Sequence, residues 1–168
     1  YTPSGEDVEV YADSNRLEQV LTNLVSNAIK FTPDAGTIEI TSRVVNAREL
    51  QYDHCFEDDI KRLQGNYLQV CVEDHGIGIE RKDLNHVFDK FAQIENSLSR
   101  KVGGSGLGLP IARQLMESHN GAIWCDSEIN KGSKFYFVIP IANDKSNFLM
   151  IRKQLAQKAR SNGSTIAV

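Results

Sequence analysis

Three polar side chains in the first third of the chain share the spacing of one helix face. Asn23, Asn27 and Lys30 lie four and three residues apart, which places them within roughly a sixth of a turn of one another on an α-helix. An amide oxygen there could serve a hydrated Mg²⁺, and the amine could attract phosphate oxygens. An ordinary solvated helix face has the same composition, and for this helix taken alone it is the simpler interpretation.

A second cluster, residues 73–79, joins a carboxylate to two glycines directly after a predicted strand. Asp74 stands at the strand end, and Gly76 and Gly78 follow it. The carboxylate could accept a hydrogen bond from an exocyclic amine, while the glycines would let the chain turn closely around a flat ring. A glycine-rich turn capped by an aspartate is the alternative. His75 needs no role in either interpretation.

A third cluster, residues 103–109, is rich in glycine and runs into a predicted helix. Glycine lets backbone N–H groups approach phosphate at a helix N-terminus, where the helix dipole also favours negative charge. The cluster lacks the lysine of a P-loop and the preceding strand of a dinucleotide-binding fingerprint. A glycine run is weak evidence by itself, so a phosphate site here would have to be of another kind.

Apolar periodicity predicts the elements that must position these clusters. A helix closed by Pro33 and Gly36 is predicted by seven apolar residues at helical spacing: Leu17, Val20, Leu21, Leu24, Val25, Ala28 and Ile29. Asp13 or Asn15 could cap its start. Strands are predicted at 8–11, 37–45, 67–73, 122–127 and 134–141, and further helices at 81–91 and 109–119.

This order of elements favours an α+β fold with helices on one face of a sheet over a doubly wound parallel sheet. Residues 46–66 form a polar stretch between two strands and include Glu57–Asp59. We interpret this insertion as a solvated excursion with room for one helical turn.

Composition excludes several classes of protein. The 168 residues suit one domain. The 19 Lys and Arg against 22 Asp and Glu, a net charge of -3, provide no basic field for nucleic acid or an anionic membrane. No apolar run approaches the roughly 20 residues that span a bilayer. Three scattered cysteines indicate neither a disulfide framework nor a zinc site. We therefore expect a soluble protein of a reducing cytosol that binds no nucleic acid.

Four motifs in one order resemble those of sensor histidine kinases. Asn23–Thr32 resembles their N box, the Asp74 segment their G1 box, Phe88–Phe91 their F box and Gly104–Leu109 their G2 box. The resemblance implies the catalytic, ATP-binding (HATPase_c) domain of a two-component sensor histidine kinase. It also implies the Bergerat (GHKL ATPase) fold shared with gyrase B and MutL. That fold would be a two-layer α/β sandwich with a mixed sheet, three main helices on one face and a mobile ATP lid at about 80–103.

The same resemblance implies roles for individual residues in binding ATP and Mg²⁺. Asn27 would be the metal ligand, and Asn23 and Lys30 would be the catalytic residues that contact phosphate. Asp74 would recognise the adenine amine. Gly76 and Gly78 would shape the adenine pocket, and Gly104, Gly106 and Gly108 would hinge the lid and meet phosphate. Phe88 and Phe91 would anchor the lid. The remaining nucleotide-binding positions would be Ile79, Leu107 and Phe91 itself. Arg100 and Lys101 are basic enough to reach the γ-phosphate.

Two positions bear on the reaction type. Gyrase- and MutL-type ATPases resemble one another in having a water-activating glutamate four residues before the metal-binding asparagine, where this chain has Asn23. The missing base argues against ATP hydrolysis as the main reaction. Gln93 stands where many histidine kinases carry arginine, which leaves open whether a cation assists transfer there.

The reaction implied by the resemblance is transfer of the ATP γ-phosphoryl group to an imidazole nitrogen. None of His54, His75, His86 and His119 lies in the helical pattern of the family's phosphoacceptor helix. We therefore expect the acceptor on a separate dimerisation domain before Tyr1, a response-regulator receiver domain as a further partner, a monomeric fragment and a homodimeric full-length kinase. A nucleotide-binding regulatory pseudokinase and a response-regulator docking module are the alternatives.

We expect a catalytic domain at 1–143 and a linker or tail at 144–168. The tail combines rough helical apolar spacing, the polar Ser161–Ser164 and an apolar end. It resembles a linker into another domain, such as the receiver of a hybrid kinase, while a disordered C-terminus is the alternative. The domain would be the cytoplasmic part of a membrane-anchored or soluble sensor kinase.

Overall fold

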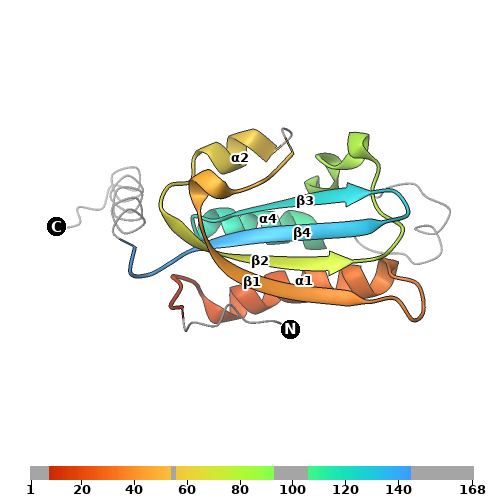
Figure 1. Ribbon diagram of the computed structural model, residues 1–168, viewed down its shortest axis with the longest axis horizontal. Coiled ribbons are helices and arrows are strands. Elements are labelled where there is room, and N and C mark those ends of the chain that lie inside the picture. Colours follow the sequence, from red (N-terminus) through yellow and green to blue (C-terminus); the bar gives the residue numbers. More distant parts are fainter. Residues whose placement is uncertain (1–7, 54–55, 93–105, 145–168) are drawn as a thin grey trace.

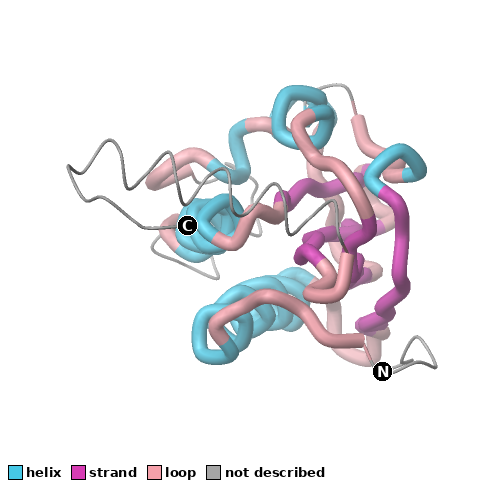
Figure 2. Tube along the Cα trace, turned by 90° about the vertical axis from the view of Figure 1, so that its left-hand side faces the viewer, coloured by secondary structure: helices cyan, strands magenta, loops and turns pink. Residues whose placement is uncertain are grey.

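The computed structural model describes residues 8–53, 56–92 and 106–144. In this part of the chain a single sheet carries its two long helices on one face (Figures 1 and 2). No helix in the described part is long and apolar enough to cross a membrane. The predicted tail lies almost wholly outside the described residues.

The sheet has four strands: β1 (Ile38–Asn46), β2 (Asn66–Asp74), β3 (Ala122–Glu128) and β4 (Gly132–Pro140). Their order is β1-β2-β4-β3, and every neighbouring pair is antiparallel. The α+β prediction is confirmed, but the predicted mixed sheet is wrong for the described strands. β1 and β2 run in opposite directions, as do β3 and β4, and β4 lies beside β2 with reversed direction, so no parallel pair arises.

The two long helices are α1 (Ser14–Phe31) and α4 (Gly108–Ser118). The apolar stripe of α1 buries Val20, Leu24 and Ala28 against the core, as its periodicity predicts. Asp13 caps its start by accepting hydrogen bonds from the backbone N–H groups of residues 15 and 16. In the described part of the chain, two long helices, and not the three main helices predicted, form the layer behind the sheet in Figure 1.

The helix predicted at 81–91 is absent. Two single 3₁₀ turns, Arg81–Asp83 and His86–Phe88, occupy that segment. The backbone is extended before the first turn, at Glu80, and again after the second, at Asp89. Three buried side chains at helical spacing explain the wrong prediction: Leu84, Val87 and Phe88. They cover only one turn, which is too little to nucleate a lasting helix.

The insertion (residues 46–66) is not the solvated excursion that its polar composition predicts. It contains a 3₁₀ turn at Ala47–Glu49 and the short helix α2 (Glu57–Lys61). Four of its apolar side chains are buried: Leu50, Phe56, Ile60 and Leu63. The indole N–H of Trp124 on β3 donates to its backbone at Gln51 O, 3.1 Å away. The insertion thus supplies part of the core, and α2 lies along the β3 side of the sheet (Figure 1).

The short strand predicted at 8–11 is reduced to one bridge between Val10 and Ile141. Backbone hydrogen bonds from Tyr11 N to Pro140 O and from Ala142 N to Glu9 O flank this bridge. The segments that enter and leave the described domain are therefore paired with each other, which closes the fold at one end of β4.

Candidate functional site

The polar face of α1 meets the start of α4. Asn23, Asn27 and Lys30 are all half-buried on α1. The Asn23 side-chain amide donates to Gly108 O at 3.1 Å, although 85 residues separate the two positions. A Cβ added at Gly108 would lie 3.4 Å from Asn23 Oδ1. Two of the three predicted clusters, the polar helix face and the glycine-rich helix start, are therefore in contact.

Asp74, from the second cluster, ends β2 as a buried carboxyl with only 5% of its surface exposed. Its Oδ1 accepts a hydrogen bond from Gly76 N at 2.9 Å. Burial raises the pKa of this carboxyl, and the backbone N–H groups of Gly76 and Ser133 oppose that rise by stabilising the anion. Each oxygen of a buried carboxylate has two lone pairs, so Asp74 can accept a further hydrogen bond from a ligand amine.

The two glycines after Asp74 are required by contacts within the protein. A Cβ at Gly76 would lie 2.4 Å from Phe31 O, at the end of α1. Gly78 has a φ of +70°, and a Cβ there would lie 2.1 Å from Glu128 O. The loop is thus pressed between α1 and the β3–β4 turn, which is a different reason for glycine from the flat ring that the sequence suggested.

Sequence reasoning missed the residues at the end of β3 and in the β3–β4 turn that hold this loop. Ser127 Oγ accepts from Ile79 N at 2.8 Å and donates to Gly132 O at 2.8 Å. Asn130 N donates to Ile77 O at 2.8 Å. Asn130, Lys131 and Gly132 are recognisable in the sequence as a hairpin turn, but that signal does not reveal which distant loop the turn contacts.

The segment predicted to anchor a lid divides into a buried and an exposed aromatic residue. Phe88 is 4% exposed and packs edge-on against Phe56 and Phe135. Phe91 is 72% exposed and has a φ of +65°, so its side chain is no core anchor. Its backbone N–H donates to Gly106 O at 3.1 Å. The two borders of the undescribed stretch 93–105 therefore meet at this pair.

Of the remaining predicted positions, some lie within the described residues and some outside them. Ile79 and Leu107 are half-buried, Ile79 against the core. Arg100, Lys101 and Gly104 lie outside the described residues, as does Gln93. Within the described part of the chain no three His, Cys, Asp or Glu side chains are grouped as a metal site.

Comparison with known proteins identifies the family. Residues 12–143 match the family of histidine kinase-, DNA gyrase B-, and HSP90-like ATPases, HATPase_c. The chain belongs to this family. The family implied by the four motifs is confirmed, and so is the α+β class of its fold, although the sheet of the described strands is antiparallel and not mixed.

The HATPase_c domain also has relatives and structural neighbours among histidine kinases. The sensor histidine kinase WalK of Bacillus subtilis is 35% identical over 84% of this chain, and the chain spans 20% of WalK. The catalytic domain of the histidine kinase ThkA is 33% identical, with a TM-score of 0.59 over 83% of this chain and 75% of ThkA. Full-length ShkA in complex with AMPPNP is 27% identical, with a TM-score of 0.60 over 83% of this chain and 24% of ShkA.

Proposed function

We propose that this HATPase_c domain binds Mg·ATP and transfers its γ-phosphoryl group to a histidine on a separate dimerisation and phosphoacceptor domain. The contact between Asn23 and Gly108 carries the proposal. It joins the face of α1 that carries the two asparagines and the lysine to the start of α4, where the glycine-rich cluster runs into the helix. Backbone N–H groups at a helix start favour phosphate. The buried Asp74 lies near the C-terminal end of α1, since a Cβ at Gly76 would meet both Phe31 O and Asp74 Oδ1. The site therefore offers a polar end for phosphates and an acceptor for the adenine amine.

The residues present fit a magnesium-bound triphosphate. Mg²⁺ keeps several waters and takes few protein ligands when phosphate oxygens supply the others. The half-buried amide of Asn27 would hold it on the face that Asn23 shares. When bound, the ion would neutralise charge on the β- and γ-phosphates. Lys30 would contribute a further positive charge, and its Nζ lies 4.8 Å from the ring centroid of Phe31.

The chain's own residues support transfer over hydrolysis. Asn23 occupies the position of the water-activating glutamate of gyrase-type relatives, and an amide does not take up a proton from water. This domain would orient the γ-phosphoryl group in line with an unprotonated imidazole nitrogen. A P–N bond would form while the bond to the β–γ bridging oxygen breaks, and ADP would leave with that electron pair.

The nucleophile would come from another domain. His75 Nδ1 lies 3.2 Å from Thr37 O and His86 Nδ1 lies 2.9 Å from Asp89 Oδ2. His119 Nδ1 lies 2.7 Å from Leu115 O, and its Nε2 accepts from Asp13 N. These three described histidines are engaged locally. We infer a homodimeric full-length kinase, a monomeric fragment and a receiver domain of a response regulator as a further partner.

Calorimetry with a non-hydrolysable ATP analogue, with and without Mg²⁺, tests the binding half of this proposal. We expect binding that strengthens with Mg²⁺ in the wild type and loses that dependence in Asn27→Ala. A folded wild type that binds no nucleotide would contradict the site.

Phosphotransfer to a supplied acceptor domain tests the reaction. We expect labelled phosphate on the acceptor histidine with the wild type and none with Asn27→Ala. Nucleotide binding without any transfer would favour the regulatory pseudokinase, and ATP-dependent capture of a response regulator without transfer would favour the docking module.

A further inference from the structure

The insertion (residues 46–66) contacts both segments that border the phosphate end of the candidate site. We define that end by Gly106 and Gly108 of the glycine-rich cluster, with Asn23 beside Gly108 and Phe91 beside Gly106. We propose that the insertion is a positioning element for the phosphate end, acting through Phe56 and Asp59. The inference rests on the proposed nucleotide binding and assigns a role to a segment that none of the four motifs includes.

The first contact is aromatic. Phe56, just before α2, is 2% exposed, and its ring centroid lies 5.8 Å from that of Phe88 at an interplanar angle of 85°. Phe88 in turn packs against Phe135 of β4 at 6.4 Å and 74°. Edge-to-face packing on both sides fixes the Phe88 ring more tightly than burial alone.

The chain between Phe88 and Phe91 is short and hydrogen-bonded to itself. Asp89 N donates to His86 O at 3.0 Å, and Ala92 N donates to Asp89 O at 3.2 Å. The orientation of Phe88 therefore determines where the backbone of Phe91 meets Gly106. Phe56 acts on the phosphate end through this route.

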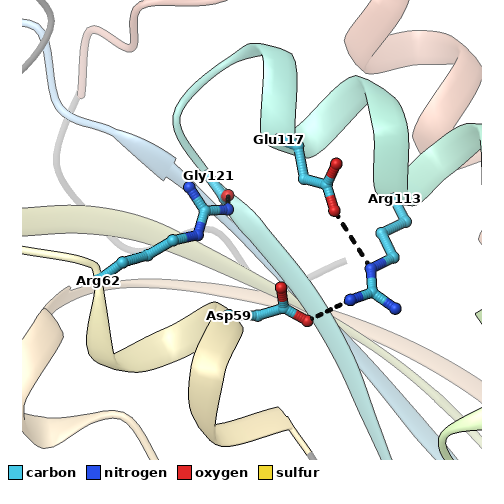
Figure 3. Close-up of polar contacts among 5 residues, drawn as sticks. All are labelled: Asp59, Arg62, Arg113, Glu117 and Gly121. Carbon is cyan, nitrogen blue, oxygen red and sulfur yellow. Dashed lines mark hydrogen bonds and ion pairs between the residues drawn. The ribbon is translucent and has the colours of Figure 1, made fainter. Parts of the chain in front are cut away.

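The second contact is polar and joins α2 to α4 (Figure 3). Asp59 Oδ2 accepts from the Arg113 guanidinium at 2.7 Å, and Arg113 Nε contacts Glu117 Oε1 at 3.2 Å. Arg62 donates to Gly121 O at 2.8 Å, in the short connection between α4 and β3. The side chains of Asp59 and Arg113 are 22% and 34% exposed, so this pair is more shielded than an ordinary surface ion pair.

These contacts hold the helix whose first residue is Gly108. An 11-residue helix is a rigid body, so fixing its middle and its end also fixes its start. Gly108 O accepts from Asn23, and a shift of α4 would therefore change the geometry at which the two phosphate-facing clusters meet.

The adenine end is held by other elements. Asp74 and Gly76 are positioned by β4 and by the end of α1, and Ile79 by Ser127. On this side, Asp53 of the insertion pairs with Arg81, which is 80% exposed. Loss of the insertion's two contacts should therefore weaken recognition of the phosphates and leave recognition of adenosine unchanged.

Calorimetric titration of the 168-residue chain with two ligands separates a positioning role from a merely structural one. We would compare Phe56→Leu and Asp59→Ala with Lys61→Ala, which removes the exposed ion pair between Lys61 and Glu57 within α2. The ligands are a non-hydrolysable ATP analogue with Mg²⁺ and adenosine alone. We expect both test variants to bind the analogue at least about fivefold more weakly, with adenosine affinity within about twofold and the control unchanged.

An equal loss of affinity for both ligands would overturn the inference, because it would indicate general destabilisation of the domain. An unchanged affinity for the ATP analogue in both test variants would overturn the inference as well. If Phe56→Leu does not fold, Asp59→Ala decides alone, since it removes a half-buried carboxylate and no core volume. A wild type that binds neither ligand refutes the proposed function itself, whereas a wild type that binds both, with unchanged variants, refutes only the role of the insertion.

Discussion

Replacing Asp74 by asparagine separates what this carboxyl does for binding from what it does for stability. Asp74→Asn keeps the shape of the side chain and one oxygen, so the hydrogen bond from Gly76 N can persist. The second oxygen becomes an NH₂ group, which donates where an adenine amine would need an acceptor. The variant therefore changes hydrogen-bond polarity at one atom with little change in packing.

The expected loss of affinity follows from the chemistry of that atom. A hydrogen bond to a charged group contributes about 1.5–3 kcal/mol, so its loss would weaken binding of an ATP analogue roughly 10- to 150-fold. Asp74 is almost fully buried, so solvent would do little to reduce this effect.

Asp74→Asn should weaken nucleotide binding without lowering the free energy of unfolding. Burial raises the pKa of Asp74 above its unfolded value, so the folded state binds the proton more tightly than the unfolded state. The free energy of unfolding of the wild type therefore falls as the pH rises from the unfolded pKa through the folded pKa. The neutral amide avoids this loss, and Asp74→Asn should be at least as stable as the wild type at pH 7.

The assay is calorimetric titration with the analogue at pH 7, together with urea unfolding of both proteins at pH 7 and pH 4. We expect weaker binding by the variant and a stability difference that favours the variant more at pH 7 than at pH 4. Unchanged affinity would refute the assignment of Asp74 to the adenine amine. A variant that loses stability more at pH 7 than at pH 4 would refute the reasoning about burial.

Three further predictions concern the loop and the sheet around this site. Gly78→Ala should lower the free energy of unfolding, measured with urea, by more than about 2 kcal/mol, because its φ is +70° and its Cβ would meet a backbone oxygen at 2.1 Å. Gly108→Ala, whose Cβ has room, should leave that free energy nearly unchanged. Equal losses in the two variants would contradict the argument. Ser127→Ala should lower the free energy of unfolding by about 1–3 kcal/mol, because Ile79 N loses its hydrogen-bond acceptor, and it should also weaken binding of the ATP analogue. An unchanged free energy of unfolding would show that another acceptor replaces the hydroxyl. Burial raises the pKa of Cys71 to about 11, so its alkylation by iodoacetamide, followed by peptide mass spectrometry, should be slow at pH 8 and accelerate towards pH 11; fast labelling at pH 8 would contradict this.

The sequence predicted those features whose signal lies within a few neighbouring residues. The stripe Val20, Leu24 and Ala28 defines α1 because helical periodicity and burial coincide there. The four strands were predicted to within two residues at each end, since β-branched and aromatic residues alternate or cluster along them. The order of the four motifs indicated the family that the comparison confirms.

Where local signal was thin, the sequence misled. The insertion was interpreted as solvated because its buried residues are separated by charged ones such as Asp58. Three apolar residues at helical spacing produced a helix prediction at 81–91 that the structure replaces with two turns. Each of these segments takes its conformation from contacts with distant parts of the chain, which override weak local preference.

Only the tertiary structure decided how the clusters combine. Asn23 meets Gly108, and Phe56 meets Phe88, across sequence separations that leave no trace in local composition. The reason for glycine at position 78 is likewise a contact with Glu128 O. Residue types determined what chemistry each cluster could perform, because the chemistry depends on the side-chain atoms. The packing of α1, α4 and the β3–β4 turn against one sheet determined which of these atoms share a site. That packing depends on the burial of apolar surface by the whole chain.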